Sequence, residues 1–503
     1  MKRLRSPTAS LRVGATIAVS ALLGACAPGA TPPPTLSQVV AQPPDSFLAA
    51  APDQSAQIDE RWWLRFGDPL LARYVERAVE SSPAVLQAIA RMEQAGAAAR
   101  IARADLFPQI SAGLDASRSR QNLAGSGFGA ILGGADGGND GDGDDSPTSF
   151  VNDSFQLTGR VSWDIDLWGR ISAQSAAARA EYFASRENLR AARQSIAAEV
   201  VRNYFNVVTA NQQVAVSSEL VDAIAEVARQ VNNRAKVGIA PPNDRTLAIA
   251  NLGQARAGLA QQREGLVRVT RGFDQLIRAY PDGEVATASA LPAVPPAPPA
   301  GLPADLLLRR PDIRAAEWQL RAAGFRLDAA RRSFLPGISL TGNAGTSSSA
   351  LENLLDGEFF VWTIAGSVLQ PIFQGGRLRA QLAQADGVQA EAVAAYTETV
   401  LQALTEVETA LAADQQLLAR QEALEVAAEA ARASVEISFN RYRAGLDPFV
   451  TVLESQQSAL DANAAYLDAV SARLDNRVTL HQALGGGFGD MPPAVQAPAI
   501  SQD

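Results

Sequence analysis

The side chains that most often carry out chemistry are sparse in this sequence, and their spacing fits few reactions. Asp140, Asp142 and Asp144 alternate in a Gly/Asp-rich segment, as calcium ligands do at the start of a binding loop. Such a loop needs glycine at its sixth position and glutamate at its twelfth, where this sequence has Asp145 and Val151. We therefore interpret the segment as a flexible, solvated loop and not as a metal site.

Histidine and cysteine, which dominate catalytic and metal-binding sites, each occur once. His481 lies near the predicted end of a helix and has no cysteine partner, so we expect it to be structural. The sequence contains no phosphate-binding glycine loop and no nucleophile elbow. One histidine with three methionines also makes a poor ligand set for copper or silver. The sequence therefore predicts no enzyme activity, no cofactor and no metal site.

The single cysteine, Cys26, follows a segment with the features of an export signal. The segment has a basic start, an apolar stretch and then small residues, and it is too short to span a membrane as a helix. Its end, LGAC, resembles a bacterial lipobox, in which cleavage before the cysteine precedes lipid attachment. We expect a signal peptide at residues 1–25 and a lipid on Cys26. Ala27 in place of aspartate favours outer-membrane delivery, and an idle buried thiol is the alternative.

The amino-acid composition indicates a large folded region with extended segments beside it. A sequence of 503 residues with 47% apolar residues can bury a core, and a net charge of −9 argues against nucleic acid as the main partner. Proline-rich sequence predicts an extended segment at residues 26–60 and a linker or strap at 281–310. The tail at residues 486–503 carries little structural signal.

The sequence on either side of the strap is duplicated. The segments NRAKVGIAPP and NRYRAGLDPF place Gly238 and Gly445 at equivalent positions 207 residues apart, each with a proline three residues later. Glycine ends a helix and proline suits the start of the next, so both segments are predicted to be tight turns between antiparallel helices. We expect two repeats, residues 61–280 and 311–485, each with the order helix, strand, loop, strand, long helix, turn, helix.

Alternation of apolar and polar residues predicts two strands in each repeat. Phe155, Leu157 and Val161 belong to one such series, which has the two-residue period of a strand that crosses a membrane with lipid on one face. A half-buried sheet of a soluble domain is the alternative. The predicted strands occupy about residues 108–118 and 153–167 in the first repeat, and 336–346 and 359–370 in the second.

Four strands cannot close a barrel, because about eight is the smallest number that spans an outer membrane and open edges are not tolerated in lipid. Assembly of several chains is therefore expected. Each repeat continues with Ala-rich helical sequence that has a coiled-coil seam, and its long helix would extend for about 100 Å. The predicted helices are residues 170–236 and 243–280 in the first repeat, and 377–443 and 449–484 in the second.

Several stretches resemble the TolC-like outer membrane factors of tripartite efflux and secretion systems, in the NodT/OprM lipoprotein branch. The likeness covers about residues 60–485. The resemblance implies a mostly α protein with a membrane β-barrel portion. Three chains would share one 12-stranded outer-membrane β-barrel and one long periplasmic α-helical barrel. The stretches that carry the likeness are FGDPLLARYVERAV from Phe66, LLLRRPDIRAAEWQLRAA from Leu306, FLPGISLTG from Phe334, LQPIFQGGRLRAQLAQA from Leu369 and RYRAGLDPFVTVLESQQ from Arg441.

The same resemblance implies a gate at the periplasmic tips, around Gly238 and Gly445. Tyr442 falls at the family's tip tyrosine, Asp244 at the aspartate that this tyrosine hydrogen-bonds, and Glu454 at an acidic position of the constriction. Three Glu454 carboxylates in a ring would repel anions and attract cations. The alternatives are an N-cap role for Asp244 and an ordinary exposed side chain for Glu454.

Neighbouring residues complete the predicted tip. Asn243 directly precedes Asp244, Arg441 directly precedes Tyr442, and both are further candidates for the gate. The chain departs from the TolC pattern at Thr451, where that protein has an aspartate, and at Asp447, where it has an arginine. The hydrogen bonds that close the tip are therefore expected to differ from those of TolC.

These expectations add up to a passive exit duct for small molecules in the bacterial outer membrane. Its expected partners are two further copies of the chain, a periplasmic adaptor protein, an inner-membrane transporter that supplies the energy, and outer-membrane lipid. A duct for type I protein secretion is the nearest alternative. A structural or adhesive coiled-coil surface lipoprotein is a more distant one. The sequence does not identify the cargo.

Overall fold

A computed structural model describes residues 32–40, 46–48, 60–122, 149–298, 303 and 306–486. The predicted signal peptide, Cys26 and the segment with Asp140, Asp142 and Asp144 lie outside these residues. The chain divides into two compact units. One unit contains Gly96–Arg179 and Arg321–Gln389, and the other contains Ala180–Leu320, the part of Pro32–Ala95 that is described, and the chain from Ala390 onward.

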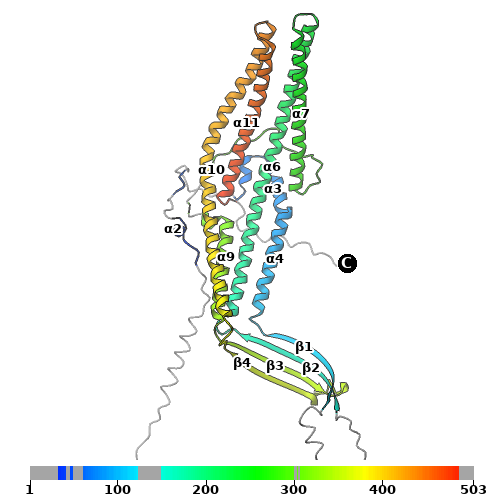
Figure 1. Ribbon diagram of the computed structural model, residues 1–503, viewed down its shortest axis with the longest axis vertical. Coiled ribbons are helices and arrows are strands. Elements are labelled where there is room, and N and C mark those ends of the chain that lie inside the picture. Colours follow the sequence, from blue (N-terminus) through cyan, green and yellow to red (C-terminus); the bar gives the residue numbers. More distant parts are fainter. Residues whose placement is uncertain are drawn as a thin grey trace, which may run out of the picture. The chain divides into compact units, whose positions relative to one another are not determined.

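A four-stranded antiparallel sheet dominates the first unit (Figure 1). Its strands run in chain order, β1, β2, β3 and β4, so β1 and β4 are the edges within the described chain. The end of β1 and the start of β2 extend further than predicted, because the hydrogen-bond ladder between these strands continues to the pair Asn122 and Ser149. The strands are β1 (Gln109–Asn122), β2 (Ser149–Ile165), β3 (Gly337–Ser348) and β4 (Phe360–Leu369).

The register collects most of the apolar side chains of the four strands on one face of the sheet, while Val361, Ala365 and Leu369 of β4 lie on the other. Across the sheet, Ala112 pairs with Gly159, Gly159 with Ala344, and Ala344 with Trp362. Residues two apart share a face, so the neighbouring apolar positions of each strand form parallel rows. Trp362 keeps 66% of its surface exposed in the single chain. The sheet therefore presents an apolar face that its own chain leaves open.

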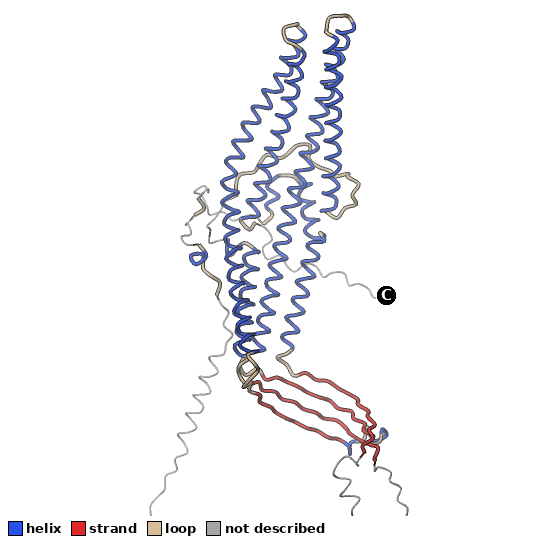
Figure 2. The backbone as a smooth tube through the Cα atoms, in the orientation of Figure 1, coloured by secondary structure: helices blue, strands red, loops and turns tan. Residues whose placement is uncertain are grey.

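Helices make up most of the second unit, as the blue segments of Figure 2 show. The two long helices have 67 residues each and the two that follow the turns have 35 each. No helix among the described residues is both long enough and apolar enough to cross a membrane. The α-helices of the described residues in both units are α2 (Leu36–Val39), α3 (Pro69–Ser81), α4 (Pro83–Ala104), α6 (Arg170–Lys236), α7 (Pro242–Leu276), α8 (Leu306–Arg309), α9 (Pro311–Arg332), α10 (Arg377–Arg443) and α11 (Phe449–Ala483). Parts of α4, α6, α9 and α10 belong to the first unit.

Three further features differ from the sequence prediction. Helix α7 ends at Leu276 and not near residue 280, because Arg278 has a φ of 54°, which an α-helix does not allow. The predicted linker at 281–310 is not extended throughout, since α8 lies within it. Gly486, assigned to the tail, is tied to the fold because its carbonyl accepts a hydrogen bond from Gln194.

The main core of the second unit forms where the short helix Trp62–Phe66 and α3 meet α6, α7 and α11. The strap after α7 is fastened to this core by two tyrosines. The Tyr74 hydroxyl donates to the carbonyl of Ala286, while the Tyr204 hydroxyl donates to Asp68 and accepts from the backbone N–H of Ala288. The proline-rich strap is thus held by specific hydrogen bonds and not by apolar contact alone.

Candidate functional site at the tips of the two helical hairpins

The two predicted turns have the same backbone structure. Gly238 and Gly445 have φ values of 76° and 75°, a region that glycine enters without strain. The N–H of Ile239 donates to the carbonyl of Arg234, and the N–H of Leu446 donates to the carbonyl of Arg441, at 2.9 and 3.0 Å. This is the bond of a Schellman helix end, and the duplicated residues make it twice. The turns join α6 to α7 and α10 to α11.

One apolar cluster holds the tips of the two hairpins together. Val231 and Ala248 come from the first hairpin, and Tyr442, Phe449 and Val452 come from the second. The rings of Tyr442 and Phe449 lie 5.2 Å apart between centroids. Because this cluster contains side chains from both hairpins, movement of one hairpin away from the other would expose it to water.

A hydrogen bond joins the hairpins beside this cluster. The Tyr442 hydroxyl donates to Asp244 Oδ2 at 3.2 Å. Burial of the phenol, with the charge of Asp244 beside it, raises the pKa of Tyr442, so the hydroxyl keeps its proton and remains the donor. The alternative N-cap role for Asp244 is wrong, since α7 begins at Pro242 and its N-cap residue is Pro241.

The other predicted residues lie apart from this bond. Arg441 binds Asp447 of its own turn, with Nε and Nη2 at 2.6 and 2.9 Å from the two carboxylate oxygens. The hydrogen bond from Arg441 lowers the pKa of Asp447 below its usual value. Asn243 is exposed beside Asp244, and Glu454 is exposed on α11 without a hydrogen-bond or ion-pair partner among the described residues. Thr451 donates its backbone N–H to the carbonyl of Pro448.

Arg234 is a tip residue that our sequence analysis missed. Its Nη1 donates to the backbone carbonyl of Arg443 at 3.2 Å, and its guanidinium carbon lies 5.6 Å from the centre of the Tyr442 ring. The side chain therefore crosses from the first hairpin to the second. The duplication carries a signal that identifies Arg234, because it occupies the same place in its turn as Arg441 does in the other.

Both turns also present apolar side chains to solvent. Val237 and Ile239 in the first turn keep 69% and 66% of their surface exposed, and Leu446 in the second keeps 65%. Ile239 and Leu446 are equivalent residues of the two repeats. Both turns therefore carry apolar surface that the chain itself leaves exposed.

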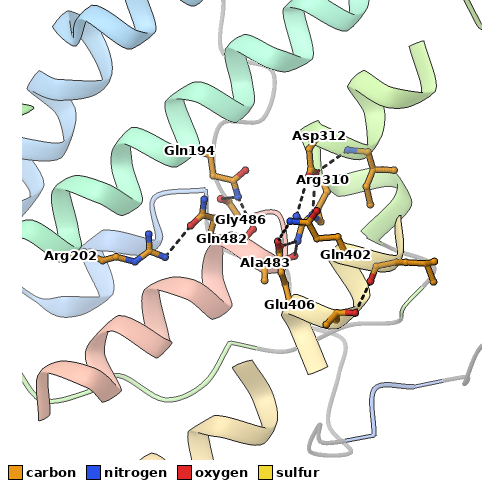
Figure 3. A network of polar contacts seen from close by, with 12 residues as sticks. Gln194, Arg202, Arg310, Asp312, Gln402, Glu406, Gln482, Ala483 and Gly486 are labelled. Atoms are coloured by element: carbon orange, nitrogen blue, oxygen red, sulfur yellow. Dashed lines mark hydrogen bonds and ion pairs between the residues drawn. The ribbon is translucent and has the colours of Figure 1, made fainter. Parts of the chain in front are cut away.

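A polar network fixes the opposite end of α11, away from the turns (Figure 3). Arg310 donates to the carbonyl of Ala483 at 3.0 Å and forms ion pairs with Asp312 and Glu406. Gln194 on α6 donates to the carbonyls of Gln482 and Gly486. The bond from Arg310 satisfies a carbonyl that the end of a helix leaves without an internal partner. Helices α6, α10 and α11 are therefore held together at this level.

Glu187 and His481 are among the buried titratable groups that lie outside the tips. Glu187 of α6 is fully buried and lies between Arg190, Arg186 and Arg314, at 3.1, 3.5 and 3.8 Å. His481 of α11 is also fully buried and stacks on Trp62, with ring centres 5.2 Å apart. The expected structural role of His481 agrees with this position in the core.

Known proteins match most of the chain. The sequence pattern of the outer membrane efflux protein family matches residues 74–271 and 302–486. Outer membrane protein OprJ of Pseudomonas aeruginosa is 33% identical over 480 residues, which cover 93% of this chain and 95% of OprJ. The outer-membrane channel OprN superposes with a TM-score of 0.80 at 25% identity, over 91% of this chain and 99% of OprN. The open state of Neisseria gonorrhoeae MtrE superposes with a TM-score of 0.77 at 28% identity, over 92% of this chain and 98% of MtrE.

Proposed function

The chain belongs to the outer membrane efflux protein family, and on this premise we propose that it is the exit duct of a tripartite pump, gated at its hairpin tips. Its relatives are outer-membrane components of efflux pumps, and the structures that it resembles are trimeric channels and not enzymes. The protein is therefore an efflux channel of the outer membrane. The gate, the pump partners and the lipid anchor are the proposed parts of this function.

The open apolar face of the sheet supports a trimeric barrel. An edge strand in a membrane leaves backbone groups that neither water nor lipid can satisfy, so β1 and β4 require partner strands. Three copies supply three sheets, and each β4 can then pair with the β1 of the next copy. The apolar rows that include Trp362 would face lipid in this arrangement.

The hydrogen bond from Tyr442 to Asp244 is the observation that carries the gating proposal. It joins two hairpins of one chain at the level where three pairs of hairpins would close the duct. The exposed apolar turns beside it offer the surface for a periplasmic adaptor, which would shift the tips toward an open state. Small molecules would then pass from an inner-membrane transporter to the exterior, and the energy would come from that transporter.

Replacing two tip residues together tests the gate. We expect Tyr442→Phe with Glu454→Ala to raise single-channel conductance in planar bilayers. The first change removes the bond to Asp244, and the second removes an exposed carboxylate that we place in the constriction. Glu436→Ala, which removes an exposed carboxylate of α10 outside the turns, serves as the control. Conductance equal to that of the unmodified trimer would refute the gate assignment.

A duct for secreted proteins remains the nearest alternative function. The efflux proposal predicts that deletion of the chain raises sensitivity to small toxic compounds and leaves the set of secreted proteins unchanged. Loss of a secreted protein with unchanged drug sensitivity would favour the alternative. A structural surface lipoprotein would not conduct at all, so ion conductance by the purified trimer separates that possibility from both ducts.

Lipidation of Cys26 is proposed from the sequence, because this residue lies outside the described part of the chain. Each buried methylene contributes about 0.8 kcal/mol to membrane binding, so several acyl chains would hold the protein firmly. We expect cells grown with labelled palmitate to label the unmodified protein and not Cys26→Ser. Intact-protein mass spectrometry should show the matching loss of acyl mass. Equal labelling of both proteins would exclude Cys26 as the attachment site.

A further inference from the structure

The duplicated arginines of the two turns make different contacts. The backbone carbonyls of Arg234 and Arg441 accept equivalent hydrogen bonds in equivalent turns. Their side chains differ, because the guanidinium of Arg441 binds Asp447 of its own turn. The residue of the first turn at the position of Asp447 is Ala240. Arg234 therefore has no carboxylate in its own turn, and its side chain reaches the second hairpin.

Two contacts hold Arg234 in this crossing position. The carbonyl of Arg443 lies in the last turn of α10, where carbonyls lack an internal donor and the helix dipole favours a cation. The face of the Tyr442 ring attracts the same guanidinium. Arg234 thus contacts the residue that also binds Asp244, so its position affects the hydrogen bond proposed as the gate.

Because the two turns are equivalent, the contacts of Arg234 within a chain predict where Arg441 lies between copies of the expected trimer. Three chains with two hairpins each place six hairpins in a ring, and each hairpin meets the next at a seam. Three of these six seams lie within chains and three lie between copies. The seam within a chain contains Arg234 and the carbonyl of Arg443. By equivalence, Arg441 is the residue placed to reach the carbonyl of Lys236 in the next copy. In the structure, Asp447 holds Arg441 in its own turn.

We propose that Arg234 is a positioning residue that latches the two hairpins of each chain together, while Asp447 withdraws Arg441 from the seam between copies. The closed tip would then be fastened mainly by contacts within each chain, and its opening would separate the two hairpins of that chain. The link to gating rests on the proposed function. The latch itself does not, since it concerns the contact between two hairpins of one chain.

Two substitutions with opposite expected effects test the proposal. Ala240→Asp gives Arg234 a carboxylate in its own turn, copying the pair of Arg441 with Asp447, so the hairpins should separate and the open fraction in bilayers should rise several-fold. Asp447→Ala releases Arg441 toward the next copy, so the open fraction should fall. Arg234→Gln should act like Ala240→Asp. Arg245→Gln, which removes an exposed charge from the first turn of α7, should leave the open fraction unchanged.

A distance measurement separates the latch from the gate. Spin labels at Ile249 and Ile437, both exposed, report the distance between hairpins of one chain when labelled copies are diluted into unlabelled ones. We expect a broader and longer distance distribution for Arg234→Gln and Ala240→Asp than for the unmodified chain. An unchanged distribution in both variants would overturn the latch. A changed distribution with unchanged conductance would retain the latch and refute the gate, and a rise in open fraction for Asp447→Ala would refute the withdrawal of Arg441.

Discussion

Replacing Glu187 with glutamine is expected to destabilise the protein by roughly 3 kcal/mol, because it removes the counter-charge of three arginines. Glu187 is fully buried, whereas the side chains of Arg190, Arg314 and Arg186 are 18%, 35% and 41% exposed. Partial solvation of the arginines limits the cost, and for this reason the value lies at the lower end of the range for broken buried pairs. Guanidinium unfolding of the detergent-solubilised protein, followed by far-UV circular dichroism, measures the change.

A second glutamate of the same helix provides the matched control. Glu226 forms an ion pair with Arg229, and both side chains are largely exposed, at 45% and 69%. Solvent-exposed pairs contribute little to stability, so Glu226→Gln should leave the unfolding midpoint nearly unchanged. Glu187→Asp, which keeps the charge, should retain part of the stability lost in Glu187→Gln. Equal midpoints for Glu187→Gln and Glu226→Gln would contradict the role assigned to the buried carboxylate.

Acid is expected to destabilise the fold through His481. Burial of the imidazole, together with the nearby cations Arg65 and Arg477, lowers its pKa from 6.5 to about 3. The unfolded chain therefore binds a proton between these values and the folded chain does not. The contribution of His481 to the free energy of unfolding is fully present well above pH 6.5. Between about pH 6.5 and 3 it falls by about 1.4 kcal/mol for each pH unit. The loss from this residue should reach about 2 kcal/mol at pH 5.

A neutral replacement isolates this contribution from the other groups that titrate in acid. His481→Phe keeps an aromatic ring against Trp62 and cannot take up a proton. The difference in unfolding free energy between the two proteins should be constant above pH 6.5. Below that pH it should move steadily in favour of His481→Phe. A difference that stays constant down to pH 5 would show that the ring is accessible to protons in the folded state.

Structural features that depend on a short stretch of sequence were predicted correctly, and those that depend on distant contacts were not. Alternating residues such as Phe155 and Leu157 predicted the strands, because a two-residue period is a property of the strand itself. The glycines at 238 and 445 predicted the turns for the same reason. Strand ends were less accurate, since β1 and β2 extend to the pair Asn122 and Ser149 through contact with each other. Helix α7 stopped early at a backbone angle of Arg278 that no sequence pattern indicated.

The candidate site was only partly predictable. The family resemblance paired Tyr442 with Asp244, and the structure contains that hydrogen bond. Arg234 was missed because its partner is a backbone carbonyl on another helix. Every residue has a backbone carbonyl, so the sequence does not show which one a side chain will contact. Glu187 was missed for a related reason. Its buried position depends on the packing of α6 against α9, whereas the sequence shows an ordinary helical glutamate beside an arginine.

The equal lengths of the paired helices restrict how this chain can change during evolution. The two long helices have 67 residues each and the two shorter ones have 35 each. One residue inserted into α6 alone, between Gln194 and the turn, would rotate everything beyond it by about 100° and point Arg234 away from its acceptor. A substitution on an exposed helix surface leaves this rotation unchanged, whereas a single insertion does not. An insertion that keeps these contacts must add the same number of residues, close to a whole number of helical turns, to all four helices, so the four helix lengths can only change together.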